Sequence, residues 1–329
     1  MAYLREAPYI SRHLRIDEKK TIERFVDYLQ DLSERFATSG VLIGLSGGID
    51  SSVLSTLAVH AMGKDSVHLE YLYDQHSAND LRHHARLMAE WLGIELQERS
   101  IEPAMREAAV YAPFGMMVTS FSGLLNRFLH QTYRFVFRET PFISSLRLGS
   151  AEASKGDLSQ PGFRMIIRQP ETGLNVRHQY RRQVLEEKAH ERNWLLLGAA
   201  NRTEWLVGWF VKDGIDDLPI QPLIGLYKTQ VRQIAAFLEI PAEVQHQASS
   251  PDMMRGFTDE FTLGLSYSRI DLILDYLDGG LTKEMLLNTG IRNKEIRLVQ
   301  EMNRLSHWKR GPAHTHLPVD GGLDGGLRL

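Results

Sequence analysis

The chain has 329 residues, of which 43% are hydrophobic and 24% charged, and its formal net charge is −3. This composition is typical of a globular protein with one large domain or two smaller ones. No run approaches the ~20 apolar residues of a membrane span, the polar N-terminus does not resemble a secretory signal and the mild acidity gives no indication of nucleic-acid binding, so we expect a cytoplasmic protein.

Helix and strand patterns alternate in the N-terminal third. The predicted elements, in chain order, are helix 17–37, strand 41–45, helix 52–62, strand 67–73, helix 79–92 and strand 94–99. This order predicts a doubly wound α/β fold, in which helices flank both faces of a parallel sheet. Ligands of such sheets bind at the carboxyl ends of the strands.

The remainder is less regular. Residues 103–170 have the character of an insertion, with a possible helix at 116–137 and a loop at 149–170. Clear patterns then return, and the predicted elements are helix 176–192, strand 194–197, helix 227–238, a mobile loop at 241–262, and helices 267–277, 281–288 and 292–305. We therefore expect a single domain over residues 1–312, with the insertion around 103–170, and a flexible C-terminal tail at 313–329.

The turn between the first strand and the second helix carries the strongest chemical signal. It combines glycines and hydroxyl residues with one acid, in the order Gly44-Leu45-Ser46-Gly47-Gly48-Ile49-Asp50-Ser51-Ser52. A strand that turns into a helix through Gly-Gly directs backbone N–H groups and the positive end of the helix dipole at one point, which favours a phosphate. A carboxylate at such a site requires a divalent cation between it and the phosphate.

This turn resembles the PP-loop of the ATP pyrophosphatase superfamily, whose fold is of the adenine nucleotide alpha hydrolase type. The resemblance implies ATP as a substrate and attack on its α-phosphate, which yields an adenylate and pyrophosphate. The chain has no G-x-x-x-x-G-K-[ST] sequence, so the loop is not the P-loop of kinases and GTPases.

Further motifs follow in a fixed order. They are Gly198-Ala199-Ala200-Asn201-Arg202-Thr203-Glu204, Gly208-Trp209-Phe210-Val211-Lys212, Pro222-Leu223, Leu226-Tyr227-Lys228-Thr229-Gln230-Val231-Arg232, Ser250-Pro251-Asp252, Thr258-Asp259-Glu260, Leu263-Gly264 and Trp308-Lys309-Arg310-Gly311-Pro312. With the PP-loop they resemble the NAD synthase family, which uses ATP and ammonia to amidate deamido-NAD and releases AMP and pyrophosphate.

The resemblance implies roles for individual residues. Asp50 and Glu204 correspond to the ligands of Mg²⁺, and Lys228 to the lysine that neutralises the phosphates; these three are the expected catalytic residues. The expected ATP-binding residues are Gly44, Ser46, Gly47, Gly48, Asp50, Ser51, Ser52, Lys228 and Ser250. The residues expected to bind the acceptor are Asn175, Arg181, Lys212, Asp252, Lys309 and Arg310.

The acceptor side departs from the family pattern. Where the family has Ala-Arg, a stacking tyrosine and two aspartates, this chain has His178-Gln179, Glu186, and Ile215 and Pro219, although Asp216 and Asp217 lie nearby. Three interpretations stay open: an ammonia-dependent NAD synthase, a ligase that applies the same chemistry to another carboxylic acid, and a nucleotide-binding protein without catalysis.

The chain contains no cysteine. It therefore has no disulfide, no thiolate zinc site and no Cys nucleophile of the kind that glutaminase domains use. We expect free ammonia to be the nitrogen donor, supplied in the cell by a separate glutaminase if glutamine is its source. The resemblance also implies a homodimer whose interface helps to build the acceptor site.

Overall fold

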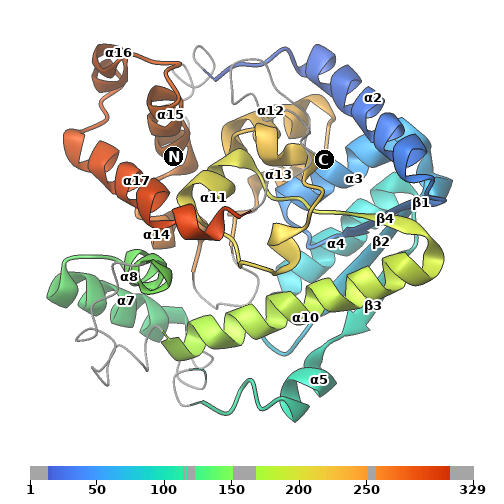
Figure 1. Ribbon diagram of the computed structural model, residues 1–329, viewed down its shortest axis with the longest axis horizontal. Coiled ribbons are helices and arrows are strands. Elements are labelled where there is room, and N and C mark those ends of the chain that lie inside the picture. The colour runs from blue at the N-terminus through green and yellow to red at the C-terminus, as the bar shows by residue number, and fades with distance from the viewer. Residues whose placement is uncertain (1–13, 114–115, 117–122, 151–167, 251–256, 312–329) are drawn as a thin grey trace.

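The computed structural model describes residues 14–113, 116, 123–150, 168–250 and 257–311. At its centre is a four-stranded parallel sheet in the order β3-β2-β1-β4 (Figure 1). The strands are β1 (Gly40–Gly44), β2 (Val67–Tyr73), β3 (Leu96–Ser100) and β4 (Trp194–Leu197). The chain leaves β1 for β2 on one side and returns to β4 on the other, so the sheet has a switch point between β1 and β4.

Helices cover both faces of this sheet, which confirms the predicted doubly wound α/β fold. One face packs against α2 (Glu18–Phe36), α3 (Ile49–Met62), α4 (Asn79–Leu92) and α12 (Lys228–Phe237). The other face is covered by α5 (Glu102–Glu107) and the long α10 (Gln169–Arg192), whose Val184 and Leu185 pack on Leu42 of β1.

A second group of helices lies beside the sheet (Figure 1). Its buried core joins α8 (Pro141–Gly149), α11 (Arg202–Val207), α14 (Asp259–Leu263), α15 (Tyr267–Leu277), α16 (Lys283–Asn288) and α17 (Asn293–Leu305). The helix α7 (Gly123–Phe137) packs on α8, and α13 (Ala242–His246) packs near α3 and α12. Short 3₁₀ turns occur at η1 (Lys64–Ser66), η4 (Ile215–Asp217), η5 (Pro222–Gly225) and η6 (His307–Lys309).

Most predicted boundaries hold within two or three residues, and the exceptions are of three kinds. The helix expected at 176–192 begins earlier, at Gln169, because Pro170 occupies the first turn, where its missing N–H costs no hydrogen bond. The segment 241–262, expected to be a mobile loop, contains α13 and α14. The sequence patterns also failed to predict α5, α8 and α11.

Some predicted segments fall outside the described residues. They include most of the loop expected at 149–170, residues 251–256 and the tail expected at 313–329. The single-domain organisation of residues 1–312 stays a prediction. None of the described helices is both long and apolar enough to cross a membrane.

Candidate active site

The PP-loop is a tight turn between the end of β1 and the start of α3. Gly47 has φ +79°, and a Cβ at this position would lie 2.0 Å from the carbonyl oxygen of Leu81, so only glycine fits. Gly48 is the N-cap of α3 and has no side chain to occupy the helix end. The loop and the first turn of α3 line a large pocket, so the expected phosphate site opens onto it.

The serines of the loop hold its shape. Ser46 Oγ lies 3.1 Å from Ser51 Oγ, and the backbone N–H of Ser46 donates to Ser51 Oγ at 3.2 Å. Ser52 is fully buried, and its hydroxyl donates to the carbonyl oxygen of Gly48 at 2.8 Å. Ser52 therefore stabilises the turn from the protein interior, while Ser46 and Ser51 line the pocket.

Asp50, Glu204 and Lys228 meet at the switch point of the sheet. Asp50 is in the first turn of α3, after β1, and Glu204 is in the first turn of α11, after β4. Lys228 Nζ pairs with Asp50 Oδ2 and lies 3.0 Å from Glu204 Oε1. Asn201 Nδ2 donates to Asp50 Oδ1 at 2.9 Å. The structure thus brings the three predicted catalytic residues into direct contact.

Asp271 of α15 supports the position of the lysine. This fully buried carboxylate accepts hydrogen bonds from Thr203 Oγ1 at 2.6 Å and from the backbone N–H of Thr229 at 2.8 Å. Thr203 Oγ1 in turn accepts from the backbone N–H of Lys228 at 2.9 Å. Burial raises the pKa of Asp271 to about 6, so it is ionised at neutral pH. It joins the N-terminus of α12 to α11 and so positions both Lys228 and Glu204.

The charges in this cluster depend on one another. Burial alone would lower the pKa of Lys228, but Asp50 and Glu204 raise it above its usual range. Burial raises the pKa of Glu204, and the Lys228 ammonium opposes this. A third acid, Asp259 of α14, lies close by: Tyr267 Oη is 2.8 Å from Asp259 Oδ2 and 3.3 Å from Glu204 Oε1. One ammonium therefore lies among three acidic side chains. Burial raises the pKa of two of them, Glu204 and Asp259, so a bound cation would favour their ionised forms.

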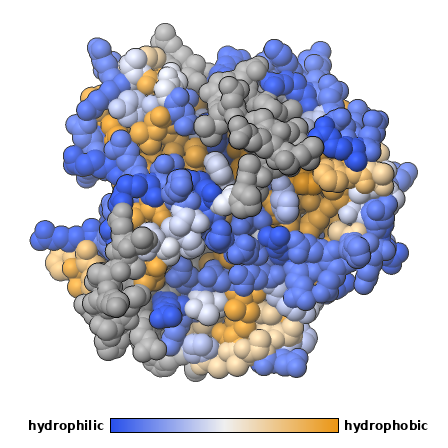
Figure 2. Space-filling model, in the orientation of Figure 1, coloured by the Kyte–Doolittle hydropathy of each residue, from blue (hydrophilic) through white to orange (hydrophobic). Residues whose placement is uncertain are grey.

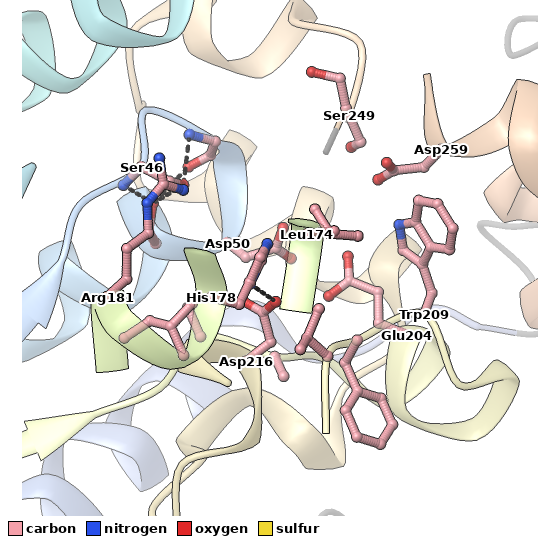
Figure 3. A pocket seen from close by; sticks show the side chains of 18 of the residues that line it. Ser46, Asp50, Leu174, His178, Arg181, Glu204, Trp209, Asp216, Ser249 and Asp259 are labelled. Atoms are coloured by element: carbon pink, nitrogen blue, oxygen red, sulfur yellow. Dashed lines mark hydrogen bonds and ion pairs between the residues drawn. The ribbon is translucent and has the colours of Figure 1, made fainter. Parts of the chain in front are cut away.

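The pocket extends from this cluster to a second wall (Figure 3). Ser46 and Arg181 lie on one side in this view, and Glu204, Trp209 and Asp259 on the other. Asn175, His178 and Arg181 line it from α10, and His178 Nδ1 lies 2.9 Å from Asp216 Oδ2.

A buried network holds Arg181 in place. Arg181 Nη2 donates to Ser77 Oγ at 3.3 Å, in the loop after β2. In the same loop, Asp74 Oδ2 accepts from Tyr111 Oη at 3.0 Å and lies 3.4 Å from Arg177 Nη1. Burial would raise the pKa of Asp74, but Arg177 and Arg181 keep it below its usual range. Because Arg177 is one helical turn before Arg181, the network fixes α10 against the end of β2.

Lys309 closes the far end of the pocket. Its Nζ donates to the backbone carbonyl oxygens of Gly208, at 2.7 Å, and Phe210. Burial lowers its pKa to about 8, although Glu171 and Asp216 oppose the shift. Glu171, whose carboxylate accepts from Ser145 Oγ at 3.0 Å, has its pKa raised by burial. Lys309 is therefore a cation at neutral pH, and it loses its charge when the pH rises through about 8.

Known proteins share this sequence pattern over most of the chain. The family model described as "NAD synthase" matches residues 21–113 and 167–313. The chain belongs to the NAD synthase family. It is 32% identical to the NH(3)-dependent NAD(+) synthetase of Thermotoga maritima over 78% of this chain and 86% of that protein. It is 28% identical to the enzyme of the same name from Methanosarcina mazei over 90% of this chain and 98% of that protein.

Solved structures share the fold of this chain. The NMN synthetase of Francisella tularensis superposes with a TM-score of 0.65 at 25% identity, covering 91% of this chain and 98% of that chain. The NH3-dependent NAD synthetase of Campylobacter jejuni superposes with a TM-score of 0.59 at 19% identity, covering 91% and 99%, and supports the fold.

Most residues assigned from the NAD synthase resemblance line the pocket. These are Gly44, Ser46, Gly48, Asp50, Ser51, Asn175, Arg181, Glu204, Lys228, Ser250 and Lys309. Of the other described residues in the assignment, Gly47, Ser52, Lys212 and Arg310 do not line it. Asp252 lies outside the described residues. The acceptor roles of Lys212, Asp252 and Arg310 stay predictions.

Most departures from the NAD synthase pattern lie away from the pocket. Gln179 and Glu186 lie on the exposed side of α10, and Glu186 Oε1 pairs with Arg182 Nε at 2.7 Å. Pro219 is also exposed, whereas Ile215 lines the pocket beside Asp216. Among these departures, Ile215 and His178 are the ones that line the pocket.

The sequence patterns assigned no role to five residues of the site: Asn201, Thr203, Asp259, Tyr267 and Asp271. Asn201, Thr203 and Asp259 stand inside quoted motifs, so the signal was present. Tyr267 and Asp271 approach from α15, and a buried helix contact of this kind leaves no short motif.

Proposed function

We propose that this protein is an ammonia-dependent ligase that activates the carboxylate of deamido-NAD with ATP and converts it to NAD, AMP and pyrophosphate. The observation that carries the proposal is the convergence of Asp50 and Glu204, from the ends of β1 and β4, on Lys228 beside the PP-loop. The family assignment names the reaction class.

The nucleotide binds, on this proposal, with its phosphates on the PP-loop. The open N-terminus of α3 and the hydroxyls of Ser46 and Ser51 donate hydrogen bonds to them. The substrate carboxylate attacks the α-phosphorus, and pyrophosphate leaves. Lys228 stabilises the negative charge that develops on the phosphates. Its ammonium is positioned for this role because Asp271 and Thr203 hold the backbone at the start of α12.

The donor set fits a Mg²⁺ ion. Asp50 and Glu204 offer hard oxygen ligands from neighbouring strand ends, and the contacts of Glu204 with Lys228 and Tyr267 both use Oε1. Among the described residues, no three acidic, His or Cys side chains are placed to hold a metal ion by themselves. Phosphate oxygens would therefore complete its coordination, and the bound ion would neutralise phosphate charge.

Ammonia completes the reaction by attacking the carbonyl carbon of the acyl adenylate, and the bond to AMP breaks. The pocket wall near Asp259 includes Trp209 and Phe257, which restrict water around this intermediate. Because the chain has no cysteine, we expect free ammonium to support turnover and glutamine to fail unless a separate glutaminase is added. Glutamine-dependent activity of the purified chain would contradict this.

The most direct test measures AMP release with ATP, ammonium and a panel of carboxylates that includes deamido-NAD. Dependence of AMP release on deamido-NAD supports the proposal. Absence of AMP release with every ribosyl nicotinate, while ATP still binds, would reject it.

A second candidate acceptor is nicotinate mononucleotide, whose amide is NMN. The observation that favours it is the likeness to the protein named NMN synthetase, which has the higher TM-score of the two structures described above. The altered wall at His178 and Ile215 is consistent with a changed acceptor. The ratio of kcat/KM for the two acceptors in the same assay decides between them.

We further propose a homodimer in the cytoplasm, as expected for an ATP-consuming member of this family. The outer face of α7 supports the dimer, because it exposes Leu124, Phe128, Phe135 and Val136, with fractional exposures from 61% to 86%. Figure 2 shows apolar side chains at the left edge of the molecule, over α7. Apolar surface of this kind typically marks an interface. Light scattering should give twice the chain mass, and Phe135→Ser should shift it towards the monomer.

A further inference from the structure

One wall of the pocket lies outside the family pattern. Residues 114–166 fall between the two segments that match the NAD synthase family, yet α7 and α8 of this region line the same pocket as the PP-loop. Their lining residues are Asn126, Leu129, His130, Pro141, Phe142 and Ser145. The family assignment therefore gives these side chains no role, although they line the same pocket.

The α7–α8 wall is firmly attached to the body of the protein. On α8, Arg147 Nη2 lies 2.8 Å from Glu301 Oε1, and the backbone carbonyl oxygen of Leu146 accepts from Trp308 Nε1 at 3.0 Å. The ring of Phe142 packs edge-on against Trp209, with centroids 4.9 Å apart. Contacts from α17, η6 and the loop after α11 thus hold α8, and α7 packs on α8.

His130 is a buried residue of this wall whose ring has an unsatisfied nitrogen. It is 5% exposed, and its Nε2 is buried without a hydrogen-bond partner among the described residues. Its ring lies 4.7 Å from Phe261 and 5.8 Å from Phe257. Burial lowers the pKa of His130 to about 4, so the imidazole is uncharged at neutral pH. Asn126, one helical turn earlier, lines the same wall and is 2% exposed.

We propose that His130 binds the acceptor, through a hydrogen bond between its Nε2 and a hydroxyl group of the ribose that carries the nicotinate. The inference rests on the proposed function, and it applies to deamido-NAD and nicotinate mononucleotide alike because both contain this ribose. A buried polar atom without a partner is costly, so a ligand group that satisfies it contributes to binding.

The chemistry of the wall favours a hydroxyl over a phosphate or a carboxylate. An anion is bound best by a charged donor, and the pocket offers Arg181 and Lys309 for this purpose from α10 and η6. The α7–α8 wall presents instead the uncharged polar groups of Asn126, His130 and Ser145. An uncharged imidazole can donate to a hydroxyl or accept from it, depending on its tautomer.

Steady-state kinetics of His130→Ala and His130→Gln test the role. The alanine variant should raise the KM for the acceptor by about 5- to 30-fold, the range expected for one lost hydrogen bond in a buried site, with the KM for ATP within a factor of two. Glutamine places an uncharged polar group near the position of Nε2, so it should restore most of the affinity. Gln131→Ala, at the neighbouring exposed position, is the matched control and should behave as wild type.

Acceptors that lack the 2′ or the 3′ hydroxyl of this ribose identify the partner atom. With the wild-type enzyme, one of these two acceptors should have its KM raised by a similar factor, because it cannot form the hydrogen bond to His130. With His130→Ala the same acceptor should show no further rise in KM, because that bond is already absent. The inference would be overturned if removal of the hydroxyl raised the KM for the acceptor equally in the wild-type enzyme and in His130→Ala. It would also be overturned if His130→Ala raised the KM for ATP as much as that for the acceptor. If the wild-type enzyme uses no ribosyl nicotinate, the proposed function itself fails, and the wild-type control reveals that separately.

Discussion

The proposed function divides the pocket into a nucleotide half and an acceptor half, and these are built in different ways. The nucleotide half consists of residues at the ends of adjacent strands, and its charged side chains are paired with one another: Asp50 and Glu204 share Lys228. The acceptor half is assembled from α7, α8, α10, the turn at η4 and Lys309 of η6. These segments are distant in sequence.

The difference follows from what holds each half together. The nucleotide half needs one arrangement of strand ends, because the sheet topology alone brings β1 and β4 together. The acceptor half depends on packing between segments, one of which, α7–α8, lies between the two segments that match the family model. We therefore expect substitutions in the first half to abolish catalysis and substitutions in the second to change affinity for one substrate.

Asp50→Asn should have the largest effect. The substitution removes one of the two carboxylates proposed to hold the metal, while the amide can still accept from Asn201. Activity should fall by about 10²- to 10³-fold or more, as for the loss of a central electrostatic group, with an unchanged circular dichroism spectrum. AMP and pyrophosphate release is the measurement, and Asp65→Asn, an exposed acid on η1, is the control. Near-normal turnover of Asp50→Asn would contradict the proposed role of Asp50 as a metal ligand in the nucleotide half.

Arg181→Ala should affect one substrate selectively. Loss of a charge-assisted contact costs about 1.5–3 kcal/mol, so the KM for the acceptor should rise by roughly 10- to 100-fold while the KM for ATP changes little. Arg192→Ala, at an exposed position at the end of α10, is the control. If both KM values rose together, Arg181 would belong to the nucleotide half, beside Ser46, and the division between the halves would be wrong.

The sequence patterns singled out the residues that meet at the centre of the nucleotide half, Asp50, Glu204 and Lys228, but not the side chains that surround them. The PP-loop lies in a continuous stretch, and its neighbours Glu204 and Lys228 stand in short motifs after a strand and at a helix start. All four strands were predicted to within about two residues because their apolar runs are bounded by turns. The support of Lys228 by Asp271 was missed, since Asp271 reaches the start of α12 from α15, across the fold.

The acceptor half was predicted only in part. Asn175, Arg181 and Lys309 line the pocket as expected from the motifs of the family. The contribution of α7 and α8 could not be predicted, since neither helix belongs to a motif and the position of α8 depends on contacts with α17 and η6. One such contact is the hydrogen bond from Trp308 Nε1 to the carbonyl oxygen of Leu146. It joins residues far apart in the chain, and local sequence patterns do not encode contacts of this kind.

Lys309 should make acceptor binding sensitive to pH. Because burial lowers its pKa to about 8, its charge is present at pH 7 and is lost as the pH rises through 8. The Kd for the acceptor should therefore increase about tenfold between pH 7 and pH 9, as expected for one titrating group. Equilibrium binding without ammonia is the appropriate measurement, since ammonium itself titrates in this range. Lys309→Arg keeps its charge throughout and should flatten the profile; an unchanged profile would exclude Lys309 as the titrating group.

Arg310→Ala should have the smallest effect on catalysis, and it sharpens the border of the acceptor half. Its guanidinium donates to the backbone carbonyl oxygens of Asn303, at 2.7 Å, and Leu206. These bonds join α17 to α11, and burial lowers the pKa of Arg310 to about 10, so it remains charged at neutral pH. The substitution should reduce the free energy of unfolding by about 1–3 kcal/mol, because buried carbonyl groups lose their donors.

The KM for the acceptor should change by less than about twofold in the same variant, a difference too small for a lost charged contact. Denaturant unfolding and steady-state kinetics, compared with Arg297→Ala at an exposed position of α17, separate the two quantities. A KM that rises tenfold with unchanged stability would restore the acceptor role that the sequence predicted for Arg310. Arg310 follows Lys309 directly in the chain. A tenfold rise in the acceptor KM would therefore add Arg310 to the acceptor half, whereas the expected unchanged KM would leave Lys309 as the last residue of that half.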